Sequence, residues 1–143
     1  MTSHPKDFSD ELIKVIATEP KMAKEIHLPV QAGSNKTLKT MNRVYTREHY
    51  LGLVKKIRKQ SPSARLSTDI IVGFPGETKR DFNATISLIK KVKYDSIFAY
   101  MYSKRHGTVA EKLPNQVDIK EKHRRVNKVL NLERKIQRKK RKN

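Results

Sequence analysis

Short apolar segments alternate with amphipathic stretches along this 143-residue chain, and that alternation restricts its fold more than any other feature. Residues 26–31 (IHLPVQ), 65–72 (RLSTDIIV) and 94–102 (YDSIFAYMY) have the length and apolar content of β-strands. Their starts lie roughly 30 to 40 residues apart, which is the length of a strand followed by a crossover helix. The sequence therefore predicts an α/β fold with about three parallel strands and right-handed crossover helices.

Apolar residues at helical spacing predict the elements between and around these strands. Thr46 and Thr78 stand directly before two such stretches and are expected to cap them. A sheet of three parallel strands leaves its edges and one face poorly covered. It therefore belongs to a larger sheet or barrel, or another chain completes it. The expected helices cover residues 8–16, 38–41, 47–59, 79–92 and 119–136.

Positive charge is the second strong feature. The chain has 33 Lys and Arg against 14 Asp and Glu, a formal net charge of +19, so nucleic acid is the first expected partner and an anionic membrane surface the second. A membrane role is disfavoured because the apolar helix face lacks Trp and Phe anchors. The final run, ERKIQRKKRKN, either binds RNA phosphates or is a solvated helix face with a frayed tip. The expected nucleic-acid contacts are Arg134, Lys135, Arg138, Lys139, Lys140, Arg141 and Lys142.

The absence of cysteine excludes several kinds of chemistry. Without cysteine the 143 residues hold no disulfide, no thiolate zinc site and no iron–sulfur cluster of the usual kind. The five histidines lack the spacing of a metal site, and no phosphate-binding P-loop is present. No apolar run approaches the roughly 18 residues of a membrane span, and the N-terminal sequence lacks the order of a secretory signal. We therefore expect a cytoplasmic protein without a membrane segment.

Three loops follow the predicted strands, at the end of the sheet where parallel α/β folds bind ligands. QAGSN offers the Gln31 amide and the Ser34 hydroxyl at a helix start, which suits a ribose or a carboxylate, although a plain turn with an N-cap explains the same residues. GFPGET, at residues 73–78, either lets a ligand lie against bare backbone or simply turns the chain from strand to helix. In SKRHGT, Arg105 has the planar fork that pairs with carboxylates and phosphates.

Four motifs together resemble one family. SHPKDFSDELI, HLPVQAGSNKTLKTMNRVYTREHY, LSTDIIVGFPGETKRDF and YSKRHGT follow the order and spacing of the radical-SAM tRNA methylthiotransferases. They are most similar to the branch that makes 2-methylthio-N6-isopentenyladenosine in tRNA. The resemblance implies a partial (β/α) barrel fragment over residues 1–116, followed by an amphipathic helix with a basic tail over residues 117–143.

The resemblance also implies an enzyme larger than this chain. Members of the family carry an N-terminal domain with one iron–sulfur cluster, a barrel whose CxxxCxxC motif holds a 4Fe–4S cluster that cleaves S-adenosylmethionine, and a C-terminal domain that binds tRNA. Lys104 and Val109 replace prolines that the family usually has, and Val44 replaces a glycine, so loop stiffness differs here. The S-adenosylmethionine contacts that the resemblance implies are Gln31, Ser34, Gly73, Pro75, Gly76, Glu77, Ser103 and Arg105.

Three interpretations of the function follow. The chain is a fragment of a tRNA methylthiotransferase that acts only when a complementary chain supplies the missing N-terminal segments, or a non-catalytic basic RNA-binding module, or a non-functional gene remnant. Because an iron–sulfur cluster requires thiolate ligands, we expect no methylthiotransferase activity from the chain alone.

Overall fold

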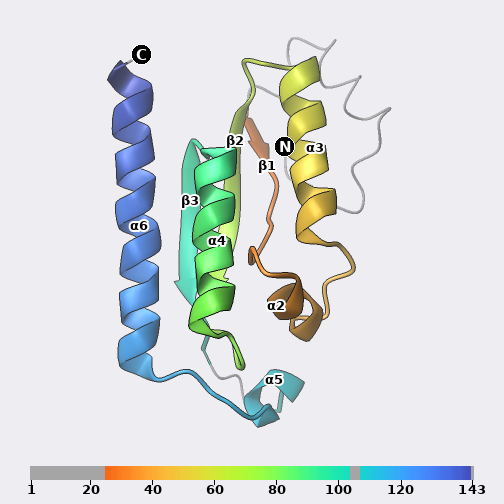
Figure 1. Cartoon of the computed structure of the whole chain (residues 1–143), viewed down its shortest axis with the longest axis vertical. Helices are drawn as coiled ribbons and strands as arrows, with labels where there is room; N and C mark the ends of the chain where they lie inside the picture. Colours follow the sequence, from red (N-terminus) through yellow and green to blue (C-terminus); the bar gives the residue numbers. More distant parts are fainter. Residues whose placement is uncertain (1–24, 104–106, 143) are drawn as a thin grey trace.

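The computed structural model describes residues 25–103 and 107–142 (Figure 1). The helix expected over residues 8–16 lies outside the described residues. The described elements are β1 (Glu25–His27), α2 (Asn35–Thr40), α3 (Arg47–Gln60), β2 (Arg65–Val72), α4 (Lys79–Val92), β3 (Ser96–Met101), α5 (Val109–Lys112) and α6 (Ile119–Lys142).

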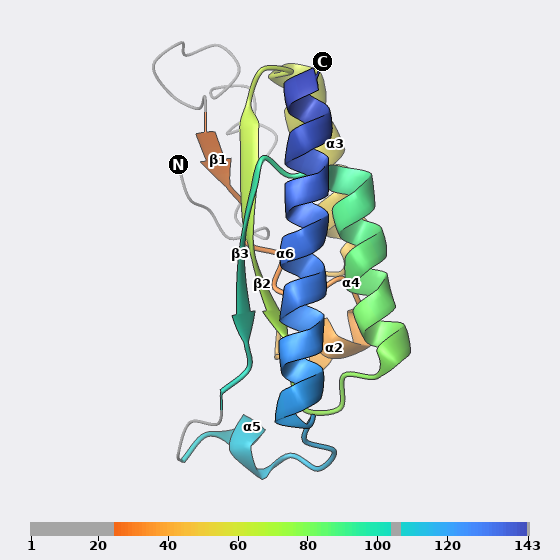
Figure 2. The same ribbon diagram turned by 90° about the vertical axis from the view of Figure 1, so that its left-hand side faces the viewer.

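The three strands form one parallel sheet in the order β1–β2–β3, as the sequence predicts. In Figure 2, α3, α4 and α6 lie along one face of this sheet, whereas α5 lies beyond its end. Burial alternates along β2, with Leu66, Thr68, Ile70 and Val72 buried and the residues between them more exposed. Helices on one face of a parallel sheet are the arrangement of a barrel segment, so the α/β partial-barrel prediction is confirmed.

The first and third strands are shorter than predicted. The β1 ladder ends at His27 because the Val30 N–H donates to the Thr68 hydroxyl instead of a β2 carbonyl. Pairing continues only as a single bridge at Gln31, which has a left-handed φ of 74°. β3 begins at Ser96 rather than at residue 94 because Lys93, with φ of 55°, takes the left-handed conformation that ends α4. Apolar content reveals neither of these causes.

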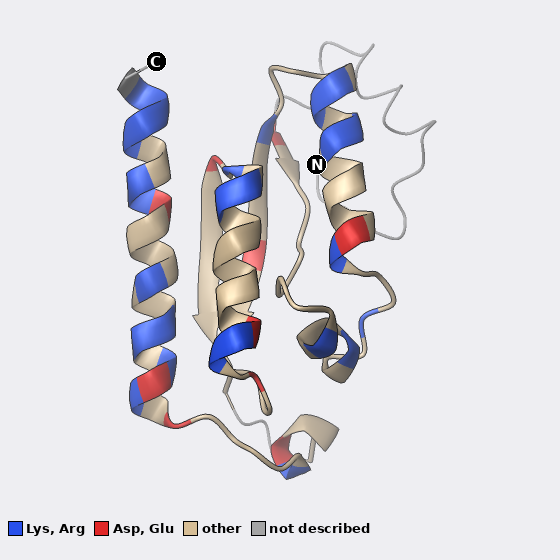
Figure 3. Cartoon of the chain, viewed as in Figure 1, with Lys and Arg blue, Asp and Glu red and all other residues tan. Residues whose placement is uncertain are grey.

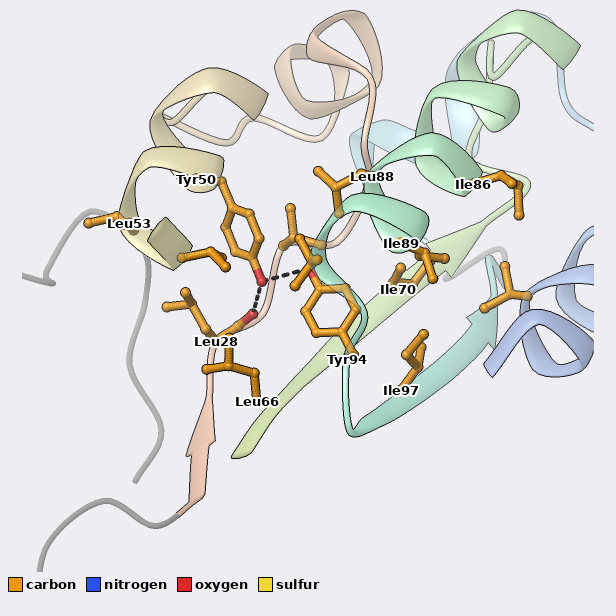
Figure 4. Packing of buried hydrophobic residues seen from close by; sticks show 14 of the residues in the cluster. Leu28, Tyr50, Leu53, Leu66, Ile70, Ile86, Leu88, Ile89, Tyr94 and Ile97 are labelled. Carbon is orange, nitrogen blue, oxygen red and sulfur yellow. Dashed lines mark hydrogen bonds between the residues drawn. The ribbon is translucent and has the colours of Figure 1, made fainter. Parts of the chain in front are cut away.

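Two buried tyrosines link the helices to the interrupted β1 segment in the core (Figure 4). The Tyr50 hydroxyl on α3 donates to the Leu28 carbonyl at 2.7 Å, and the Tyr94 hydroxyl donates to that of Tyr50 at 2.8 Å. The Thr68 hydroxyl donates to the same Leu28 carbonyl at 3.0 Å. Burial raises the pKa of both phenols, so they remain neutral hydrogen-bond donors.

The last helix extends beyond the predicted end at residue 136 and continues through the basic run to Lys142. Gln137 Nε2 donates to the Asp95 carbonyl at 2.9 Å, and Lys140 Nζ pairs with Asp95 Oδ1 at the same distance. These contacts tie the second half of α6 to the turn before β3. The basic run is therefore helical as far as Lys142.

Candidate functional site

The loops that follow β1, β2 and β3 meet at one end of the sheet, because all three strands point the same way. The same end carries α2, the start of α4, α5 and the start of α6 (Figure 1). This is the end at which parallel α/β barrels place their ligands. The three loops that the sequence singles out therefore lie at the same end of the sheet, as expected for parallel strands.

The loop after β1 carries Gln31 in a conformation unusual for a residue with a side chain, with φ of 74°. Its N–H donates to the Asp69 carbonyl and its carbonyl accepts from the Ile71 N–H, each at 2.9 Å. The backbone of Gln31 is thus held by β2 on both sides, and its side chain is partly exposed at the loop end of the sheet. Such fixed, sparsely populated geometry is common at ligand sites.

Gly33, in the same loop, approaches α4 closely. A Cβ at this position would lie 2.6 Å from the Ala84 carbonyl oxygen and from the Thr85 Cα. The Gly33 N–H donates to the Thr85 hydroxyl at 3.0 Å. Because position 33 is glycine, the loop packs directly against the backbone of α4.

Ser34 caps α2 and also reaches α4. Its hydroxyl accepts from the Thr37 N–H at 3.4 Å and donates to Asp81 Oδ1 at 2.8 Å. The predicted N-cap is confirmed, and the bond to Asp81 on the neighbouring helix is a contact that the sequence did not indicate. Any ligand contact of Ser34 stays a prediction.

Asp81 joins the first two loops. Besides Ser34, it accepts from the Thr78 N–H and hydroxyl at 2.9 and 3.0 Å, and from Lys36 Nζ at 3.1 Å. Lys36 Nζ also donates to the Gly76 carbonyl at 3.0 Å. Burial favours the neutral acid, but these hydrogen bonds outweigh it and hold the pKa of Asp81 below its ordinary value. The carboxylate therefore fixes both loops in one arrangement.

Glu77, in the second loop, is buried and faces inward. Its Oε1 accepts from the Gly73 N–H and from Arg125 Nη1, both at 2.8 Å. Arg125 also donates to the Glu77 carbonyl at 3.0 Å and pairs with Glu121 on its own helix. Burial is the dominant influence on Glu77 and raises the pKa of its carboxyl. Glu77 thus anchors α6 to the loop, and a direct role in ligand binding stays a prediction.

The rest of the second loop presents backbone rather than side chains. Gly73 and Gly76 have φ of 73° and 84°, values that favour glycine. A Cβ on Gly73 would lie 2.5 Å from the Lys122 side chain, whereas one on Gly76 would meet nothing within 4 Å. Pro75, between them, fixes the turn. The space beside the Gly76 Cα is therefore open, whereas the Gly76 N–H donates to the Asn115 carbonyl at 2.9 Å and its carbonyl accepts from Lys36.

An apolar hollow of about 500 Å³ lies beside the ends of β2 and β3. Phe74, Tyr100, Tyr102 and Ser103 are among its lining residues, and the rings of Phe74 and Tyr102 lie 5.1 Å apart. Ser103 is thus the predicted third-loop residue that the structure places beside the second loop. Arg105 lies outside the described residues.

Sequence reasoning missed a polar cluster on the face of the sheet opposite α3, α4 and α6. His27 Nδ1 lies 2.7 Å from Ser67 Oγ, and His27 Nε2 lies 3.2 Å from Asp69 Oδ2. The Phe98 ring packs edge-on against His27, with 5.8 Å between centroids. The period-2 alternation of β2, with Ser67 and Asp69 between buried residues, was the signal available in the sequence. His27 joins them only through the β1–β2 register.

The predicted nucleic-acid contacts fall on different sides of α6. Lys135, Lys139 and Lys140 line a hollow shared with α4, whereas Arg134, Arg138 and Arg141 are exposed outside that lining. Lys142 ends the helix, and its side chain is not described. Figure 3 shows the basic residues along α6 and at the upper end of α4.

Among the described residues, no group of three His, Asp or Glu side chains is placed to hold a metal ion. No helix in the described ranges is long and apolar enough to cross a membrane. The whole sequence contains no cysteine. The residues present therefore do not fit an iron–sulfur cluster.

Comparisons with known proteins extend these observations. The chain is 54% identical over 136 residues to a tRNA-2-methylthio-N(6)-dimethylallyladenosine synthase from Thermoanaerobacter pseudethanolicus, covering 95% of this chain and 29% of the relative. It is 54% identical over 142 residues to the synthase from Clostridium botulinum strain Langeland, covering 99% and 32%. The chain thus spans under a third of the length of these relatives.

Solved structures show the same fold. Coproporphyrinogen III oxidase from Escherichia coli, described as a radical SAM enzyme, superposes with a TM-score of 0.77 at 14% identity, covering 94% of this chain and 31% of the oxidase chain. A sequence model of the radical SAM superfamily matches residues 1–89. This chain belongs to the radical SAM superfamily.

Proposed function

We propose that this chain forms the latter part of the catalytic barrel of a tRNA methylthiotransferase acting on N6-dimethylallyladenosine in tRNA. The observation that carries the proposal is the 54% identity across 95% of the chain, which spans all three ligand-end loops. The partial barrel, with its loops at one end, supports it. On this proposal tRNA is the substrate, a complementary polypeptide supplies the rest of the enzyme, and the cytoplasm is its site of action.

The loops at the carboxyl ends of the three strands have residue types that suit S-adenosylmethionine. We assign it to the loops of Gln31 and Ser34, of Gly73, Pro75, Gly76 and Glu77, and of Ser103 and Arg105. Gln31 is held by β2 with a partly exposed side chain, and the space at the Cβ position of Gly76 is open, although the Gly76 N–H and carbonyl are bonded to Asn115 and Lys36. Asp81 joins the first two of these loops, and Glu77 anchors α6 to the second loop.

The iron–sulfur clusters of the family require ligands from outside these 143 residues, since the sequence has no thiolate to offer. The chain by itself then binds and orients S-adenosylmethionine but performs no radical step. A non-catalytic RNA-binding module is the second candidate, favoured by the net charge of +19.

A chimera separates these candidates. The matching segment of the Thermoanaerobacter pseudethanolicus synthase is replaced by this chain, the clusters are reconstituted anaerobically, and 2-methylthio product in tRNA is measured by mass spectrometry. We expect an active chimera and an inactive isolated chain. A chimera with full cluster absorbance, native tRNA affinity and no product would overturn the enzymatic proposal, and product from the isolated chain would overturn the expected dependence on outside ligands.

A further inference from the structure

We infer that the groove between α4 and α6 binds the phosphodiester backbone of RNA. The inference deepens the proposed function, on which it rests, by locating a surface that holds the tRNA substrate outside the ligand-end loops. The groove consists of two surface hollows of about 470 and 520 Å³ that share Lys90.

Both walls of the groove carry lysines. Lys90, Lys91 and Lys93 come from the end of α4 and the residue after it, and Lys128, Lys135 and Lys139 from α6. Lys140 completes the lining and is paired with Asp95. Of the described residues, no Asp or Glu lines either hollow. Facing rows of ammonium groups, with no carboxylate among the described lining residues, match a linear polyanion that lies between them.

The apolar residues of the groove lie between these rows. Ile86 is buried, and Leu132 and Ile136 are partly buried against the core. Lysine stems lie along such surface and keep their ammonium groups in water, which leaves the charges at the rims. An anionic membrane would instead require exposed apolar anchors. The large exposed apolar side chains of the described residues, Val44, Phe98, Tyr100, Val109 and Ile119, all lie elsewhere. RNA is therefore favoured.

The position of the groove separates it from the ligand-end loops. α4 begins at Lys79 beside the second loop and runs away from it, so Lys90 lies about 17 Å along the helix at 1.5 Å per residue. α6 runs alongside in the same direction (Figure 1). An RNA held here contacts the outer, helical side of the barrel segment, at a distance from the nucleotide at the loop end.

Charge reversal tests the groove against a matched surface. The double variant K90E/K93E is compared with K55E/K59E, which makes the same charge change at exposed positions near the end of α3. Binding of tRNA to the full 143-residue chain is measured by fluorescence anisotropy across a salt series, with circular dichroism to verify folding. We expect K90E/K93E to weaken binding about tenfold or more and to reduce the salt slope by about two, and the control to change it far less. K90Q/K93Q replaces the pair if the reversed charges unfold the end of α4.

Four results would overturn the inference. The first is equal weakening of tRNA binding by the groove and control variants. The second is weakening by R138E/R141E alone, on the other side of α6. The third is a failure of the wild-type chain to bind tRNA at about 50 mM salt. Groove-dependent binding to phosphatidylserine vesicles without groove-dependent RNA binding would also overturn it. The enzymatic proposal is decided separately by product formation in the chimera, so an inactive chimera with intact groove binding leaves the RNA surface in place.

Discussion

Gly33 lies so close to the backbone of α4 that a side chain does not fit there. The loop backbone lies against α4, with its N–H bound to the Thr85 hydroxyl. The space for a Cβ is already filled by backbone atoms, which are unable to rotate away as a flexible side chain would. Ser34, the next residue, then reaches Asp81 on the same helix. The first loop is therefore positioned by contact with α4 as well as by its strand.

Replacing Gly33 by alanine is expected to destabilise the chain by about 1–3 kcal/mol, because the added methyl group forces the loop off α4. The free energy of unfolding from urea titration measures the effect. Gly52→Ala is the matched control, since a Cβ there meets nothing within 4 Å and alanine favours the helical conformation of α3. The control should be neutral or stabilising by up to about 1 kcal/mol. Equal unfolding free energies for the two variants would contradict the packing role of Gly33.

At the scale of elements, α6 is attached at both ends. Arg125 near its start pairs with Glu77 of the β2–α4 loop, and Lys140 near its end pairs with Asp95 before β3. Glu121 supports the first attachment by accepting hydrogen bonds from Arg124 and Arg125, which lower its pKa from 4.5 to about 2. Amphipathic spacing predicted this helix. The extension of α6 to Lys142 was not predicted from the sequence. The partners that offset repulsion among its like charges belong to another element, the turn before β3, and local sequence does not reveal them.

The lowered pKa of Glu121 makes the stability of the chain depend on pH. A folded-state pKa below the unfolded value stabilises the protein above pH 4.5, and that contribution is lost as pH falls from 4.5 towards 2. We expect the urea midpoint of the wild-type chain to fall more steeply over this range than that of E121Q. Arg124→Gln should raise the Glu121 pKa measured by NMR. Parallel acid profiles for wild type and E121Q would show that the Glu121 pairs add nothing to stability.

At the scale of the whole molecule, the sheet is a barrel segment with one face bare of described helices (Figure 2). Phe98 and Tyr100 on β3 are 50% and 54% exposed on that face, beside the His27 cluster. Parallel strands are normally covered on both faces. The relatives are more than three times as long as the segments that match this chain.

The exposed Phe98 and Tyr100 on this face, together with the outer strands, predict self-association of the isolated chain. Multi-angle light scattering over a range of concentrations is expected to show a mass that rises above that of the 16.6 kDa monomer. Phe98→Ser should shift this equilibrium towards monomer, and Val44→Ser, at an exposed position before α3, serves as the control. A monodisperse monomer at all concentrations would contradict the prediction.

The sequence by itself determined the order of the elements other than the short α5, the caps of α3 and α4, and the three loops that lie at one end of the sheet. These features depend on periodicity, on hydroxyl side chains before helices and on motifs contiguous in the chain, as Thr46 and Thr78 illustrate. The tertiary structure alone decided that Glu77 faces Arg125, that Ser34 reaches Asp81 and that His27 lies beside Asp69. It also joined the lysines of α4 and α6 into one groove. Each of these contacts joins residues at least 42 positions apart, and their meeting depends on strand register and helix packing, which no local pattern encodes.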